Sequence, residues 1–130
     1  MSAKRKPKTK GELVKDYFTK WLTPLGLLWW SVKVSYYDDP NEVLQIFGDP
    51  GENRAVFAHT TVDWKYSIAW IQVNLLAVNI TPEEDLEEAV VHELVHILVN
   101  EMREGEMHHE ERVVTGLQKA FIWVSQEKWG

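Results

Sequence analysis

Cysteine is absent from this chain of 130 residues, so the fold contains no disulfide, no thiol nucleophile and no cysteine-ligated zinc. Any bound metal must therefore be held by His, Asp or Glu. Long hydrophobic runs are missing as well. The longest nearly charge-free stretches, 25–32 and 67–80, are shorter than the roughly 20 residues needed to cross a bilayer. We therefore expect no transmembrane helix and no membrane partner.

Charge is distributed unevenly along the chain. The net charge is −6, but the Lys and Arg residues of 1–10 contribute +5, which leaves −11 for 11–130. Charged residues interrupt 11–20, where a signal peptide would need an apolar run, so we expect a cytoplasmic protein. The segment 83–111 holds eleven carboxylates against one cation, Arg103. That field repels a phosphate backbone, so nucleic acid binding is expected only through the basic tail, if at all.

The apolar content is sufficient for one hydrophobic core. Hydrophobic residues make up 45% of the chain and aromatic residues 12%, at the length of an ordinary single domain. We therefore expect a flexible basic tail over 1–10 and one domain over 11–130. We interpret the seven Trp residues mainly as core residues, because the acidic body lacks the basic groove that accompanies stacking on nucleic acid bases.

The first half of the chain is predicted to form a helix and a small sheet. Apolar spacings of one, three and four predict a helix over 11–23, which Pro24 and Gly26 end. Alternating and β-branched residues predict the strands of a mixed or antiparallel sheet: 27–37, 43–47, 55–64 and 67–77. The last of these is apolar on both faces, so we expect it to be well covered.

Two helices are predicted in the second half, which makes the fold class α+β. Thr81 as a cap, Pro82 at the first helical position and Glu84 three residues after the cap predict a helix start. Apolar residues surround the second half of this helix, so we expect it to be buried. A last helix is predicted from about Met107 to Lys128. Its inward stripe is expected to contain Val113, Val114, Leu117, Ala120, Phe121 and Val124.

The buried helix contains the motif HExxH as His92-Glu93-Leu94-Val95-His96. Two His residues four apart face the same side of a helix and suit a zinc ion, while Glu93 beside them suits the general base. With this composition a shuffled chain would contain the motif about 2% of the time, so chance explains it poorly. The alternative is that His92 and His96 are hydrogen-bonded core histidines.

A catalytic zinc usually has three protein ligands and an open position, so a third ligand is expected from a neighbouring element. The candidates lie in His108-His109-Glu110-Glu111. At 100° per residue Glu110 lies on the predicted inward stripe of the last helix, and we choose it, with Glu111 and His109 as alternatives. The competing interpretation is that these carboxylates are solvated residues of a helix N-terminus.

With this motif the chain resembles the zincin metallopeptidases, and among them the small single-domain HExxH proteins of phages and prophages. The resemblance depends on 92–96, the strand 71–74 before the motif and 110–114 after it, and it covers about 67–121. The element order is similar to minimal gluzincins and to the SprT-like and ImmA/IrrE-type groups. However, the zinc ribbon of many SprT-like proteins and the third His of the metzincin spacing are absent, and the gap from His96 to Glu110 is shorter than in many gluzincins.

The resemblance implies a zincin-like fold and zinc-dependent hydrolysis of peptide bonds. His92, His96 and Glu110 would hold zinc, and Glu93 would take a proton from the metal-bound water, whose hydroxide attacks a carbonyl of a protein or peptide substrate. The substrate would lie extended along an edge strand. The resemblance to the phage and prophage proteins also implies a phage-encoded protein acting in the host cytoplasm. The alternative function is an inactive zincin-like domain that uses the metal structurally or binds a protein partner.

Overall fold

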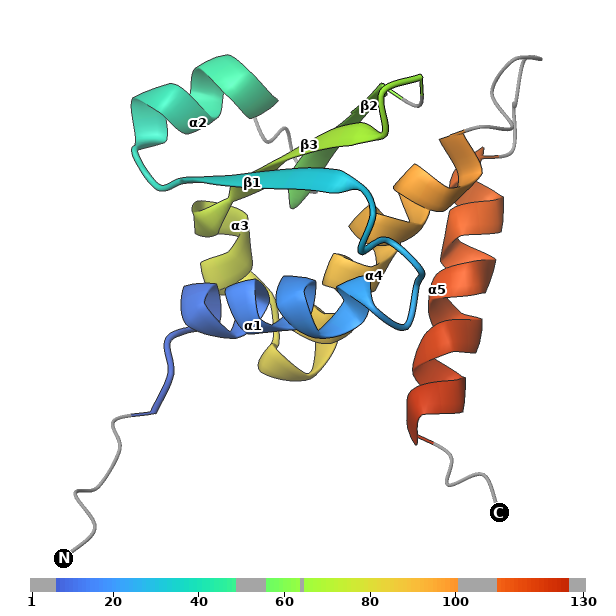
Figure 1. Ribbon diagram of the computed structural model, residues 1–130. Helices are drawn as coiled ribbons and strands as arrows, with labels where there is room; N and C mark the ends of the chain where they lie inside the picture. The colour runs from blue at the N-terminus through green and yellow to red at the C-terminus, as the bar shows by residue number, and fades with distance from the viewer. Residues whose placement is uncertain (1–6, 49–55, 64, 101–109, 127–130) are drawn as a thin grey trace, which may run out of the picture.

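The computed structural model describes residues 7–48, 56–63, 65–100 and 110–126, which form helices and a small mixed sheet (Figure 1). In chain order the elements are α1 (Lys10–Leu22), β1 (Ser31–Tyr37), α2 (Pro40–Phe47), β2 (Ala58–Asp63), β3 (Ile68–Asn74), α3 (Leu75–Ile80), α4 (Glu83–Val99) and α5 (Glu110–Gln126). The predicted α+β class is therefore confirmed. Within these ranges no helix combines the length and the apolar composition that a membrane span requires.

The sheet has the strand order β1-β3-β2, so β3 is central and the other two strands are edges. β1 runs parallel to β3, with Val34 opposite Ile71, and β2 runs antiparallel to β3, with Thr60 opposite the same Ile71. β1 and β2 begin later than predicted, at Ser31 and Ala58. The mixed sheet matches the prediction, and no described residue pairs with the outer edge of β2, which lies beside the helical layer.

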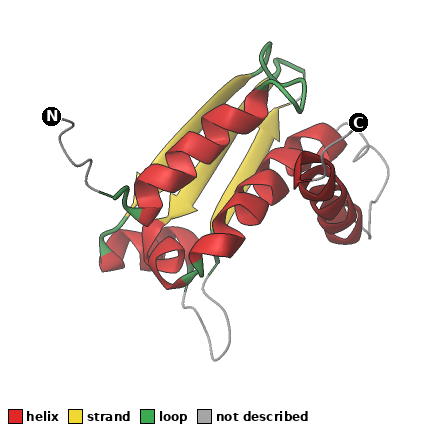
Figure 2. Cartoon of the chain, turned by 90° about the horizontal axis from the view of Figure 1, so that it is seen from below, coloured by secondary structure: helices red, strands yellow, loops and turns green. Residues whose placement is uncertain are grey.

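Helices α1 and α4 cover one face of the sheet, and α5 packs beside α4 (Figure 2). On this face Ala69, Ile71 and Val73 of β3 are fully buried against the helices. The opposite face is more open, since the side chain of Trp70 is 39% exposed. The prediction that β3 is well covered therefore holds on the helical face and fails at Trp70 on the other face. A sheet needs only one buried face, and large apolar side chains are tolerated on the other.

Residues 43–47, predicted as a strand, belong instead to helix α2. The Asp39 carboxylate accepts a hydrogen bond from the Asn41 backbone N–H at 3.0 Å, and Pro40 occupies the first helical turn. A capping aspartate followed by proline is a strong helix start. These two residues determine the local structure, although Val43 and Ile46 favour a strand on their own.

Two further boundaries differ from the prediction around α3. β3 ends at Asn74, because the Asn74 side chain accepts hydrogen bonds from the backbone N–H groups of Leu76 and Ala77 and so begins α3 within the predicted strand. Thr81 does not cap α4. Its hydroxyl donates to the Ala77 carbonyl at 2.7 Å and ends α3, so α4 starts after Pro82 without a side-chain cap.

Helix α5 buries part of the predicted stripe, since Val114 is buried and Leu117 and Phe121 pack against the core. Its buried side chains are Val114, Gln118 and Ile122, whereas Ala120 and Val124 are exposed. The periodic count follows apolar side chains only, so it could not place a buried glutamine on the inner face.

Several tryptophans also depart from the core interpretation. Trp21 is buried, but three others are substantially exposed: Trp29, Trp70 and Trp123.

One testable consequence of the packing concerns Tyr36, which lies on β1 against the core cluster. Burial raises the pKa of Tyr36 to about 12. The folded protein therefore holds this proton in a pH range where the unfolded chain has lost it, so the stabilisation is complete below pH ~10 and is lost as the pH rises through ~12. Between pH ~10 and ~12 the free energy of unfolding, measured in urea, should fall by about 1–2 kcal/mol less for Tyr36→Phe than for wild type. Tyr66→Phe, at an exposed tyrosine, is the control, and equal slopes for all three proteins would contradict the prediction.

Candidate metal centre

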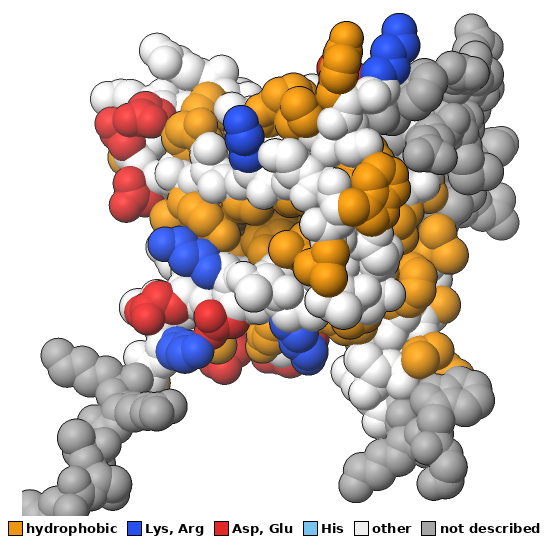
Figure 3. Space-filling model, viewed as in Figure 1, with side chains coloured by type: hydrophobic (Ala, Val, Ile, Leu, Met, Phe, Trp, Pro, Cys, Tyr) orange, Lys and Arg blue, Asp and Glu red, His pale blue; other side chains and the backbone are white. Residues whose placement is uncertain are grey.

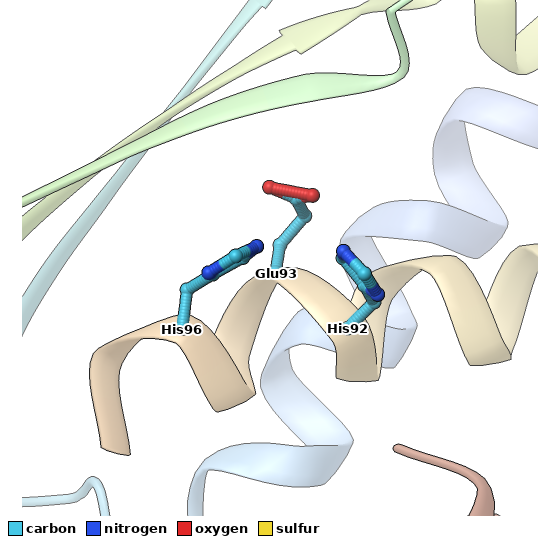
Figure 4. A group of neighbouring side chains, drawn as sticks. All are labelled: His92, Glu93 and His96. Carbon is cyan, nitrogen blue, oxygen red and sulfur yellow. The ribbon is translucent and has the colours of Figure 1, made fainter. Parts of the chain in front are cut away.

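His92, Glu93 and His96 of the HExxH motif lie on one side of α4, facing the sheet (Figure 4). His92 and His96 are one helical turn apart, and Glu93 stands between their rings. One ligand atom from each of the three side chains lies within 4.8 Å of the other two. The two imidazole rings have centroids 5.0 Å apart at an interplanar angle of 80°. The predicted trio is therefore brought together at a spacing that could hold a metal ion.

A cavity of about 550 Å³ opens above this trio, between α4 and the edge strand β2. Its remaining walls come from β2 and the residues before it, from α4 and its end, and from α5: Val56, Phe57, Ala58, His59, Thr60, Val62, Ala89, Asn100 and Gln118. Both histidines are only partly buried, whereas Glu93 is 7% exposed. His92 and His96 thus border a solvent-reachable cavity and are not closed in the core.

The Glu93 carboxylate is oriented by the sheet. The Thr60 hydroxyl of β2 donates a hydrogen bond to Glu93 Oε1 over 2.9 Å. Thr60 faces α4 because strand residues alternate between the two faces, and Ala58 and Val62 share its side. A buried carboxylate needs such a partner, since desolvation without one is costly. The hydrogen bond holds the Glu93 carboxylate at the cavity wall.

The His92 ring is oriented by α5. Its Nδ1 lies 2.7 Å from Oε1 of Gln118, a side chain that is 8% exposed. An amide oxygen only accepts hydrogen bonds, so the proton belongs on Nδ1 and the lone pair of the ring on Nε2. Metal-binding histidines generally donate their second ring N–H in this manner. The sequence did not predict Gln118, because a glutamine counts as polar in the periodicity pattern of the last helix.

The predicted third ligand lies outside the described side chains. Glu110 is the first residue of α5, but neither its side chain nor that of Glu111 is described, and His109 precedes the described part of the helix. Among the described residues, the candidate metal group contains His92, Glu93 and His96 alone. The choice of Glu110 therefore stays a prediction.

Two further side chains that could bind or polarise a ligand, His59 and Tyr66, do not belong to the trio. The His59 ring stacks on Phe47 of α2, with centroids 5.0 Å apart and an interplanar angle of 12°. Thr60, the next residue, points to α4, so the alternation of β2 turns the His59 side chain to the opposite face. Tyr66 lies in the turn between β2 and β3 and is 74% exposed. Neither side chain contributes to the trio.

Chemically, the trio offers two imidazole nitrogens and one carboxylate at a half-open cavity. Nitrogen ligands of this kind suit zinc and also other first-row transition metals, so the donor set agrees with the predicted metal without selecting it. Comparisons of the chain with protein-family models, with curated proteins and with solved structures found no match. The likeness to zincins therefore depends on the motif and its neighbouring segments, and the function has to be inferred from the residues of the site.

Proposed function

We propose that this protein is a zinc-dependent metallopeptidase. The observation that carries the proposal is the grouping of His92, Glu93 and His96 within 4.8 Å at the wall of a cavity of about 550 Å³. Hydrogen-bonded core histidines would not need a cavity beside them. Both histidines are instead accessible from a space that can admit a substrate. The Glu93 carboxylate is held by a hydrogen bond from β2, and the His92 ring by one to α5.

His92 and His96 would hold the metal, together with Glu110 of α5 or one of its alternatives, Glu111 and His109. When bound, zinc supplies a Lewis acid that activates water and polarises a carbonyl. Glu93 accepts the proton of the attacking water and later returns it to the leaving amine. Thr60 holds the Glu93 carboxylate in position for this transfer, and Gln118 fixes the His92 tautomer that can bind a metal.

The geometry around the site also suits a peptide substrate. β2 is an edge strand, and its residues Ala58, Thr60 and Val62 line the cavity above α4. An extended peptide can pair with such an edge through backbone hydrogen bonds and thereby bring a carbonyl to the cavity. We therefore place the substrate along β2, as the zincin resemblance implies for an edge strand.

The test is cleavage of a proteome-derived peptide library, read as new termini by mass spectrometry. Zinc-loaded protein should produce new termini, protein stripped with 1,10-phenanthroline should produce none, and zinc added back should restore the same termini. The expected difference between loaded and stripped protein is on the order of 10²-fold or more, because water is a poor nucleophile without the metal. Cleavage that is equal in the stripped protein would contradict a metallopeptidase.

Gln118 supplies a second prediction. The Gln118→Leu protein should bind zinc about 10–100-fold more weakly than wild type, because the Nδ1 proton of His92 loses its acceptor and the ring loses its fixed orientation. Competition with a chromophoric chelator measures the affinity. Gln126→Leu, at an exposed residue at the end of α5, is the matched control. An unchanged affinity in Gln118→Leu would mean that the hydrogen bond only packs α5 against α4.

A further inference from the structure

The far edge of the sheet, away from the metal centre, carries a second hollow. It lies between α1 and β1, has a volume of about 320 Å³ and is lined largely by apolar side chains: Phe18, Leu22, Val32, Val34 and Tyr36, with Lys15 and Thr19. Figure 3 shows hydrophobic side chains gathered in this hollow, with basic side chains on its rims. The apolar surface continues past the start of β1, where Leu28 and Trp29 are 67% and 68% exposed.

The hollow runs along an unpaired strand edge. The Ser31 backbone N–H donates to the Ser67 carbonyl over 2.8 Å, which turns the backbone groups of Ser31 toward the β3 side. Backbone groups alternate along a strand, so those of Val32, Val34 and Tyr36 point to the open edge. Among the described residues none pairs with this edge. The residues whose side chains line the hollow thus also present their N–H and C=O groups to an incoming chain.

The rim of the hollow is positive on an otherwise acidic protein. Lys15 and Lys33 are exposed, and the Lys15 ammonium lies 5.0 Å from the centre of the Tyr36 ring. The nearby carboxylates of α1 are already engaged, since Asp16 pairs with Lys8 and Glu12 accepts hydrogen bonds from Thr9. In the described part of the chain, neither Lys15 nor Lys33 has an ion-pair partner. Carboxylates are therefore expected from outside.

We propose that this edge binds an extended acidic segment of a partner protein as a fourth strand. Apolar side chains of the segment enter the hollow, alternate acidic side chains lie on the opposite face near Lys33, and an acidic residue reaches Lys15. The basic residues 1–6 of this chain are a poor occupant, because their charge has the same sign as the rim. A second copy paired through β1 is also disfavoured, because the lysines of both copies would meet.

The test uses the full-length protein and a fluorescein-labelled nonapeptide that alternates valine and glutamate between glycine ends. It should bind and shift the NMR amide signals of Val32, Val34 and Tyr36, and binding should weaken with salt. Lys33→Glu should weaken binding at least about fivefold, whereas Lys65→Glu, the same charge change in the β2–β3 turn, should not. The same peptide with lysine in place of glutamate should not bind.

A second variant tests the strand pairing itself. Val34→Pro removes a backbone N–H that points to the open edge and leaves the hydrogen bonds to β3 in place, so binding should fall at least tenfold. Methylation of alternate peptide nitrogens in the probe removes the complementary hydrogen bonds, which the probe donates to the carbonyls of this edge, without altering the protein, and it should also weaken binding at least tenfold. Equal binding of the charge-reversed or methylated peptides would overturn the proposal. So would NMR shifts confined to β2, or sedimentation of the protein as a dimer paired through β1. Binding should persist after zinc is stripped, so this test is independent of the proposed hydrolysis.

Discussion

The His96→Ala protein is expected to retain no zinc after exhaustive dialysis, whereas wild type retains about one ion per chain. His96 is half of the imidazole pair on α4, and no other described residue can replace it within 4.8 Å of His92 and Glu93. Zinc sites gain roughly 3 kcal/mol for each ligand, so losing one weakens binding by at least about a hundredfold. Elemental analysis gives the stoichiometry, and competition with a chromophoric chelator gives the affinity.

The control for this prediction is His59→Ala. His59 borders the cavity, but its ring stacks on Phe47 and it does not belong to the candidate metal group, so its removal should leave the zinc content unchanged. Wild-type protein that neither contains zinc nor takes it up would show that His92 and His96 serve only as hydrogen-bonding side chains. Zinc retained in His96→Ala but lost in His59→Ala would mean that the metal binds elsewhere.

The same assay assigns the third ligand. Glu110→Ala should lose zinc as His96→Ala does, while Glu111→Ala and His109→Ala retain it. Glu111 has to be tested in parallel, because the buried face of α5 includes Gln118, and a residue seven positions earlier in a helix has nearly the same angular position. Loss of zinc in Glu111→Ala alone would transfer the assignment to that residue.

The sequence predicted correctly those elements whose structure is determined by residues close together in the chain. The apolar periodicity of 83–99 predicted α4, and the motif on it predicted that His92, Glu93 and His96 meet. Where two local signals compete, as at Asp39-Pro40 before the β-branched residues of α2, the capping pair determined the structure. The strand prediction there weighed side-chain propensity too heavily against a helix start.

The supports of the site could not be predicted in the same way. Thr60 lies 33 positions before Glu93, and Gln118 lies 26 positions after His92. Their contacts depend on the register of β2 and on the rotation of α5 against α4, which are tertiary quantities that no sequence window contains. The error in the buried face of α5, where Gln118 and Ile122 replace Ala120 and Val124, has the same origin, since a buried glutamine counts as polar in a periodicity pattern until its partner is known.

The Glu93→Gln protein is expected to hold zinc normally and to lose hydrolysis by about 10²–10⁴-fold, the usual contribution of a general base. Glutamine keeps the size of the side chain and a carbonyl oxygen that can still accept the Thr60 hydroxyl hydrogen bond, but it cannot take a proton from water. Initial rates on the peptides cleaved by wild type measure the loss, and zinc content is determined on the same samples. Glu84→Gln, at an exposed position in the first turn of α4, should behave as wild type.

The two readouts together separate the roles open to Glu93. Activity lost with full zinc content is the result expected of a general base, because the metal keeps its histidine ligands while the proton acceptor is gone. Activity and zinc lost together would make Glu93 a metal ligand, as its place within 4.8 Å of both histidines would allow. Zinc retained and hydrolysis unchanged would contradict catalysis at this cavity and leave the metal a structural role in joining α4 to α5.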